Sequence, residues 1–111
     1  MQSEIKNIYI IAGEASGDRI GSNLIQEIIT QNPDVEFHGI GGEQMLKSGF
    51  HSLFPMNEIS YMGFLDILLN ICKLKSLINN TIEDIKSKNP DIVITIDSPG
   101  FCYRVVKGLR D

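Results

Sequence analysis

The chain has 111 residues, of which 42% are apolar, and a net charge of -4, as expected of one globular domain with a modest core. This mildly acidic balance, with no basic stripe, argues against nucleic acid as a partner, because few cations are available to neutralise phosphates. No apolar run reaches the roughly 20 residues that a membrane-spanning helix requires, which argues against an integral membrane protein.

The first predicted element is a strand over Asn7–Ile11, where the apolar residues are continuous, as in parallel strands covered on both faces. The strand leads into a glycine-punctuated turn, Ala12–Asp18. A helix follows this turn and ends before Pro33. Its apolar residues fall on one face at helical spacing: Ile20, Leu24, Ile25, Ile28 and Ile29.

The turn has the features of an anion site. Gly13 and Gly17 let the backbone turn tightly and approach a ligand, and the N–H groups of the new helix favour an anion such as phosphate. We expect Ser16 to be the N-cap, Asp18 to suit the helix dipole, and Gly21 to allow close packing on the sheet. Because the glycine spacing matches neither a dinucleotide fingerprint nor a P-loop, an ordinary first β-α unit remains the alternative interpretation.

A second strand is predicted over Val35–Ile40, and it ends in another glycine-rich turn, Gly39–Gly42. A short helix over Glu43–Lys47 follows, closed by Gly49, and a short third strand over Phe50–Phe54 comes next. These elements continue the alternation of strands and helices that is typical of a parallel sheet.

His38, near the end of the second strand, is a candidate acid-base group because the ordinary pKa of histidine is close to neutral. A single histidine at a strand end is more often a half-buried polar residue, and we favour that interpretation.

The segment Tyr61–Lys75 is apolar almost all round, and Ser60 precedes it as a helix cap. A helix buried between the sheet and its neighbours is one interpretation. In the other, part of the segment faces an acyl chain or a bilayer, while Lys73 and Lys75 meet anionic headgroups. The residues concerned are Met62, Phe64, Leu65, Leu68 and Leu69. A second, amphipathic helix then continues over Leu74–Lys88.

Asn89 and Pro90 break that helix, and Asp91–Ile96 is a β-branched strand that carries Asp97 at its carboxyl end. In open α/β sheets, ligands bind outside the carboxyl ends of the strands. If this strand and the first one are neighbours, Asp97 and the first turn converge on one edge of the sheet. Alternatively, Asp97 is a turn residue or N-cap before a last helix over Phe101–Arg110.

Four segments carry a resemblance to a known family. They are Ala12–Asp18, the Gly39–Gly42 turn with Met45 and Gly49, Tyr61–Phe64, and the strand Pro90–Pro99. In this order, from about Ile8 to Leu109, the sequence resembles the N-terminal part of the lipid-A-disaccharide synthase family. The resemblance implies an α/β fold, with a parallel sheet and helices on both faces, as the first part of the N-terminal Rossmann-like domain of a GT-B glycosyltransferase.

The activity that this resemblance implies is an inverting sugar transfer. An acylated glucosamine moves from UDP to the 6-hydroxyl of 2,3-diacylglucosamine 1-phosphate, which gives lipid A disaccharide 1-phosphate and UDP. The resemblance places Asp97 as the catalytic base, and it implies no metal and no other cofactor. The implied substrate contacts are Gly13, Glu14, Ser16, Gly17, Asp18, Met62 and Gly63. The implied acyl-chain or membrane contacts are Phe64, Leu65, Leu68 and Leu69.

Two positions depart from the family pattern, since Gly100 stands where an aspartate is usual and Asp66 where a glutamate is usual. A GT-B enzyme also needs a second, UDP-binding domain. We therefore expect residues 1–111 to be an incomplete acceptor-side domain with little or no activity alone. The implied partners are the UDP-linked acyl sugar, the acylated sugar phosphate, the missing C-terminal domain and a membrane surface.

The expected location is the cytoplasm, with peripheral association to the inner membrane. Cys72 and Cys102 have neither metal nor redox spacing, and no signal-peptide layout opens the chain. Two alternatives remain open. One is a nucleotide-binding oxidoreductase-like domain, which the glycine spacing disfavours. The other is a non-enzymatic lipid- or partner-binding module that uses the surface of Met62–Leu69.

Overall fold

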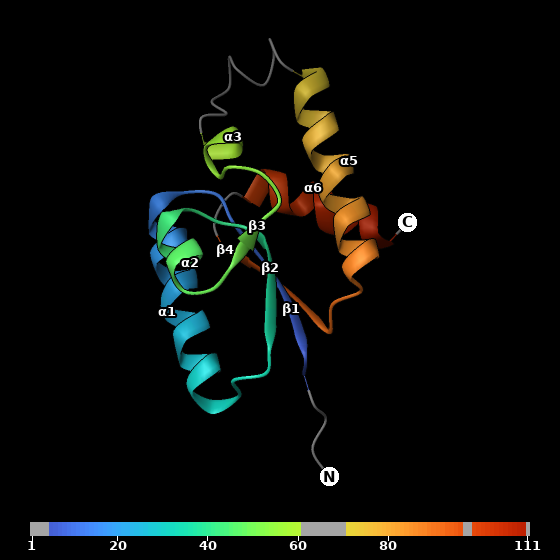
Figure 1. Ribbon diagram of the computed structural model, residues 1–111. Helices are drawn as coiled ribbons and strands as arrows, with labels where there is room; N and C mark the ends of the chain where they lie inside the picture. Colours follow the sequence, from blue (N-terminus) through green and yellow to red (C-terminus); the bar gives the residue numbers. More distant parts are fainter. Residues whose placement is uncertain (1–4, 61–70, 97–98, 111) are drawn as a thin grey trace.

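The computed structural model describes residues 5–60, 71–96 and 99–110, and these form a parallel α/β fold (Figure 1). The described strands form one sheet in the order β3-β2-β1-β4. Their bounds are β1 Asn7–Ala12, β2 Glu36–Ile40, β3 His51–Ser52 and β4 Ile92–Ile96. All three strand pairs are parallel, so the carboxyl ends of the strands meet at one edge of the sheet.

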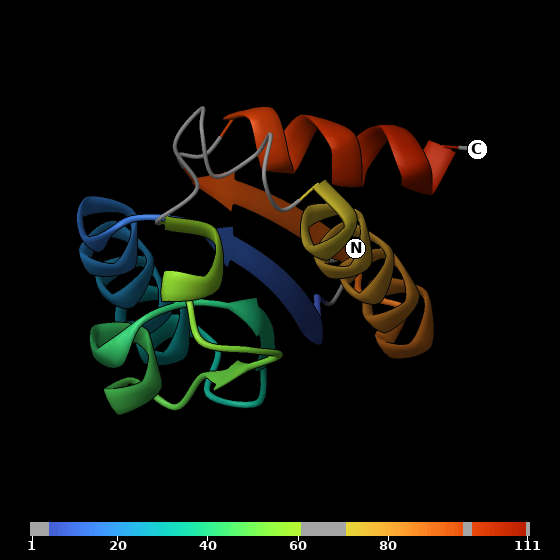
Figure 2. The same ribbon diagram turned by 90° about the horizontal axis from the view of Figure 1, so that it is seen from above.

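Helices cover both faces of this sheet (Figure 2). Helices α1 (Ala15–Gln31) and α2 (Glu43–Lys47) lie on one face, and α5 (Ile71–Lys88) and α6 (Pro99–Arg110) lie on the other. The single turn α3 (Asn57–Ser60) follows β3. The predicted fold class, a parallel sheet with helices on both faces, is confirmed.

The core has two halves because β1 is covered on both faces. The α1 side includes Ile8, Ile10 and Ala12 of β1 with Ile25 and Met45. The α5 side includes Tyr9 and Ile11 with Leu77, Ile78 and Val105. Successive strand residues point to opposite faces, so the continuous apolar run of β1 supplies both halves.

Most predicted elements are confirmed within one or two residues, but two predictions were wrong. Helix α1 begins at Ala15 with Glu14 as its N-cap, so Ser16 lies inside the helix and is not the cap. Glu14 is the last residue with extended backbone, which fixes the start of the helix. The boundary expected near Leu74 is also absent, because α5 is continuous from Ile71 to Lys88. The end of α5 is as predicted, and Asn89 follows it with a φ of +47°.

Position 39 of β2 requires a glycine because the backbone of β1 lies very close to it. Its φ is +139°, and a Cβ at this position would overlap the carbonyl oxygen of Ile10. That oxygen belongs to the backbone of the central strand, so it has no side-chain freedom with which to move away.

We therefore expect Gly39→Ala to lower the free energy of unfolding by about 3 kcal/mol or more, through strain and overpacking. Gly100→Ala is the matched control, because its Cβ would meet only the Arg104 Nη1 atom, at 3.5 Å. Urea unfolding of both variants measures the difference. Equal stability of the two would contradict the assigned role of Gly39.

Tyr9 carries the buried polar contact between β1 and α5. Its hydroxyl donates a hydrogen bond to Asp84 Oδ2 at 2.7 Å, and Lys88 Nζ lies 3.2 Å from Asp84 Oδ1. Burial, followed by the hydrogen bond and charge of Asp84, raises the pKa of Tyr9 well above its ordinary value. The phenol therefore stays protonated in the folded protein at pH values where it ionises in the unfolded chain.

Tyr9→Phe is expected to lower stability at pH 7 by about 1.5–3 kcal/mol, the usual value of a hydrogen bond to a charged group. Above about pH 10, the unfolded wild-type chain releases the Tyr9 proton while the folded chain keeps it, so wild-type stability falls with pH. The variant lacks this contribution. Unfolding curves between pH 7 and 11 should thus show a steeper alkaline loss in the wild type, and parallel curves would disprove the linkage.

Candidate functional site

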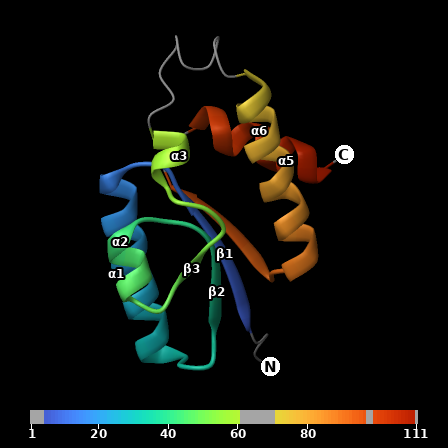
Figure 3. The same ribbon diagram turned by 45° about the horizontal axis from the view of Figure 1, so that its top comes forward.

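The candidate site is the edge of the sheet where β1, β2 and β4 end. Ala12 at the end of β1 pairs with Ile96 at the end of β4, and Ile11 pairs with Ile40 at the end of β2. The prediction that the first strand and the strand before Asp97 are neighbours is therefore confirmed. In Figure 3, helices α1 and α6 both begin at this edge.

Several predicted site residues lie outside the described part of the chain. These are Asp97, Met62, Gly63, Phe64, Leu65, Leu68 and Leu69. Their roles stay predictions. The described part of β4 ends at Ile96, which pairs with Ala12 at the end of β1.

The first loop and the start of α1 form one side of the site. Gly13 and Gly17 are buried, whereas Glu14 and Ser16 are exposed. Glu14 makes no side-chain hydrogen bond to the start of the helix. Because α1 has 17 residues, its first N–H groups present the positive end of a substantial dipole toward the carboxyl edge. This arrangement favours an anionic ligand group.

Asp18 has a different environment from that expected of a substrate contact. It is only 5% exposed, and its carboxylate accepts hydrogen bonds from three backbone N–H groups. The donors are those of Gly42, Gln44 and Met45, at 2.9, 3.0 and 3.0 Å. The carboxylate thus faces the start of α2 and not the open edge of the sheet.

The local sequence carries one signal for this contact. The N-cap of α2 is Gly42, which has no side chain with which to cap the helix. The first N–H groups therefore need an acceptor from elsewhere, and the carboxylate of Asp18 supplies it.

His38 is placed as a half-buried polar residue, as favoured above. It lies in the middle of β2, and its ring stacks on that of His51 with the ring centres 6.2 Å apart. Its Nε2 atom is 3.8 Å from Glu36 Oε1. His38 therefore lies on a face of the sheet, two residues before the strand ends at Ile40.

A hollow of about 540 Å³ lies beside β4, lined by Thr95, Pro99, Cys102, Tyr103 and Val106. The side chain of Cys72 is exposed and that of Cys102 is buried. Among the described residues, no helix has the length and apolar character needed to cross a bilayer. In the same part of the chain, no three potential metal ligands are grouped.

Comparison with known proteins gives consistent matches. A family model described as lipid-A-disaccharide synthetase matches residues 8–111. The chain is 54% identical over 104 residues to the lipid-A-disaccharide synthase of Rickettsia akari, covering 93% of this chain and 26% of that protein. It is 49% identical over 108 residues to that of Rickettsia bellii, covering 96% and 28%. For Granulibacter bethesdensis the identity is 48% over 103 residues, covering 93% and 26%. The chain thus spans about a quarter of the length of these curated relatives.

Proposed function

The chain belongs to the lipid-A-disaccharide synthase family, and we propose that it is the first part of the enzyme that joins two acylated glucosamines. In this proposal, the whole protein transfers 2,3-diacylglucosamine from UDP to 2,3-diacylglucosamine 1-phosphate and releases UDP. The observation that supports it best is the pairing of β1 with β4, which brings Ala12, where the first loop begins, beside Ile96, the residue before Asp97 in the sequence. Neither alternative, an oxidoreductase-like domain or a non-enzymatic module, is favoured by a described contact.

Asp97 is proposed to act as the general base. Displacement at the anomeric carbon requires an acceptor oxygen that loses its proton while the UDP leaves from the opposite side of the sugar. The proposal is supported by the sequence order, because Asp97 follows Ile96 at the carboxyl end of β4, and ligands of open α/β sheets bind outside the carboxyl ends of the strands.

The first loop is proposed to contact the sugar and diphosphate of the donor. Gly13 and Gly17 allow close backbone approach, Glu14 and Ser16 are exposed at the edge, and the start of α1 favours negative charge. Met62 and Gly63 are proposed to contact the acylated part of the substrates. These contacts require neither a metal nor another cofactor.

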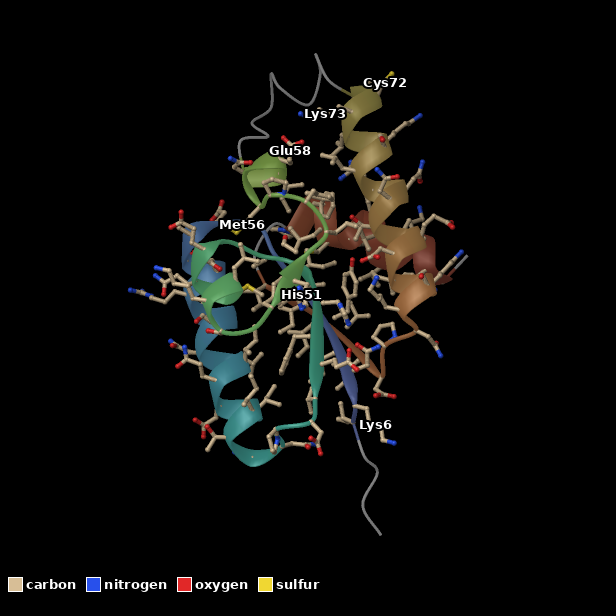
Figure 4. All side chains as sticks on the ribbon, viewed as in Figure 1. Lys6, His51, Met56, Glu58, Cys72 and Lys73 are labelled. Atoms are coloured by element: carbon tan, nitrogen blue, oxygen red, sulfur yellow. The ribbon has the colours of Figure 1, made fainter. Side chains whose placement is uncertain are left out.

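The membrane-facing surface is proposed to lie on the segment before α5, with Phe64, Leu65, Leu68 and Leu69 contacting acyl chains. Its two flanks are joined by the ion pair of Glu58 and Lys73, at 3.3 Å, as the labelled side chains of Figure 4 illustrate. Ile71 and Lys75 at the start of α5 are exposed. Such a mixture of apolar and basic groups is typical of peripheral binding to anionic lipid, here the cytoplasmic face of the inner membrane.

The remainder of the whole protein is proposed to complete this domain and to supply a UDP-binding domain. In the described sheet, β4 pairs with β1 and exposes its other edge, next to Tyr103 of α6, which is 66% exposed. Because α6 lies on the same face as α5, a right-handed crossover after α6 would add the next strand beyond β4. The relatives' greater length supports this proposal.

Asp97→Asn in the whole protein is expected to lower transfer by a factor of about 10²–10⁴, the usual contribution of a general base. Formation of the disaccharide 1-phosphate and release of UDP measure the effect. Asp34→Asn is the control, because Asp34 is exposed in the turn between α1 and β2, at the opposite edge of the sheet. Near wild-type turnover in the folded Asp97 variant would remove this residue from the proposed role.

A double variant, Phe64→Ser with Leu65→Ser, is expected to reduce co-sedimentation of the whole protein with phosphatidylethanolamine and phosphatidylglycerol vesicles, because apolar contact area is lost. The matched control is Ile20→Ser with Leu46→Ser, which removes two exposed apolar side chains from α1 and α2. If both doubles reduce vesicle binding equally, the proposed membrane surface is wrong.

A further inference from the structure

Helix α2 begins at a turn that depends on a side chain from another element. The N-cap Gly42 has nothing with which to cap the helix, and Asp18 of α1 supplies the acceptors. Asp18 Oδ1 accepts from the N–H groups of Gly42 and Met45, and Oδ2 accepts from that of Gln44. Three backbone donors on one buried carboxylate use most of the acceptor sites of Asp18 in holding this turn.

The turn is packed directly against this carboxylate. A Cβ on Gly42 would lie 2.7 Å from Asp18 Oδ2 and 2.8 Å from its Cγ atom. A Cβ on Gly41 would lie 2.6 Å from the Sδ atom of Met45, which is itself fully buried. The backbone of Gly41 and Gly42 therefore packs directly against Asp18 and Met45 and leaves no space for a methyl group.

The same residue is also joined to the first loop. The backbone N–H of Asp18 donates to the carbonyl oxygen of Glu14 at 2.9 Å. The first loop follows β1 and the Gly41–Gly42 turn follows β2, and these strands are paired through Ile11 and Ile40. Asp18 thus connects two adjacent backbone segments at the carboxyl edge of the sheet.

From this geometry we infer that Asp18 is a positioning residue, which fixes the Gly41–Gly42 turn as one side of the ligand site and does not itself contact substrate. The inference rests on the proposed function, in which the neighbouring first loop binds the UDP-linked sugar. In this inference Asp18 acts by holding the backbone N–H groups of the turn and not by binding the ligand.

A second contact between α1 and α2, at the other end of α2, provides a matched control. Ser22 Oγ lies 2.8 Å from Ser48 Oγ, and Gln26 Nε2 donates to Ser48 Oγ at 3.1 Å. Ser48 is the C-cap of α2, so this contact joins α1 to the end of α2 that lies farther from the ligand edge. Ser22→Ala should weaken the packing of α1 on α2 without releasing the Gly41–Gly42 turn.

The test compares Asp18→Ala, Asp18→Asn and Ser22→Ala in the whole protein, at a temperature where each variant is folded by circular dichroism. We expect Asp18→Ala to lower kcat/KM by about tenfold or more, mainly by raising KM for the UDP-sugar, because the site loses its geometry and keeps its base. Asp18→Asn should be intermediate, since its amide oxygen retains the two bonds of Oδ1. Ser22→Ala should leave kcat/KM unchanged. An unchanged kcat/KM in folded Asp18→Ala, or an equal loss in Ser22→Ala, would overturn the inference.

Amide hydrogen exchange supplies a readout that does not depend on activity. The N–H groups of Gly42 and Met45 should exchange faster in Asp18→Ala than in the wild type, and at the wild-type rate in Ser22→Ala. If the wild-type protein transfers no sugar while this exchange pattern holds, the proposed function fails and the positioning of the turn stands. If exchange at Gly42 and Met45 is unaltered in Asp18→Ala, the inference itself is wrong.

Discussion

The parallel pairing of β1 on both of its sides is the constraint on which the rest of the structure depends. Residues Tyr9, Ile10 and Ile11 are fully buried, so β1 has one favourable register against β2 and β4. A slip by one residue would exchange its two sets of side chains between the α1 face and the α5 face. The burial of β1 on both faces thus fixes its register, and this register brings the ends of β1, β2 and β4 together at one edge of the sheet.

Two buried polar side chains then join helices to this sheet and to each other. Tyr9 reaches Asp84 of α5 on one face, and Asp18 of α1 holds the start of α2 on the other. An unpaired polar group in these positions would cost about 1–3 kcal/mol, whereas an apolar contact would have no preferred geometry. Both contacts therefore add directional positioning that the apolar core alone does not supply.

The sequence predicted the parts of the fold that local pattern determines. Continuous apolar residues identified β1 and β4, and Glu43–Lys47 was placed with its observed bounds. The capping of α2 was not predicted, because Asp18 lies 24 residues before Gly42 in the chain and the contact depends on how α1 packs. Ser16 was misplaced as a cap for a related reason, since the path of the backbone after β1 decides where helical geometry begins.

Two glycine-rich turns look alike in the sequence but differ in how many of their backbone N–H groups already donate to protein side chains. After β2, the N–H of Gly41 donates to Ser52 Oγ, and those of Gly42, Gln44 and Met45 donate to Asp18. The glycines there make room for Met45 and Asp18, so the packing of the turn itself requires them. After β1, helix α1 begins at Ala15, and its N-cap Glu14 makes no side-chain hydrogen bond to the helix. Within the described residues, a negatively charged ligand group therefore finds a more favourable environment at the start of α1 than at the start of α2, whose first N–H groups already donate to Asp18.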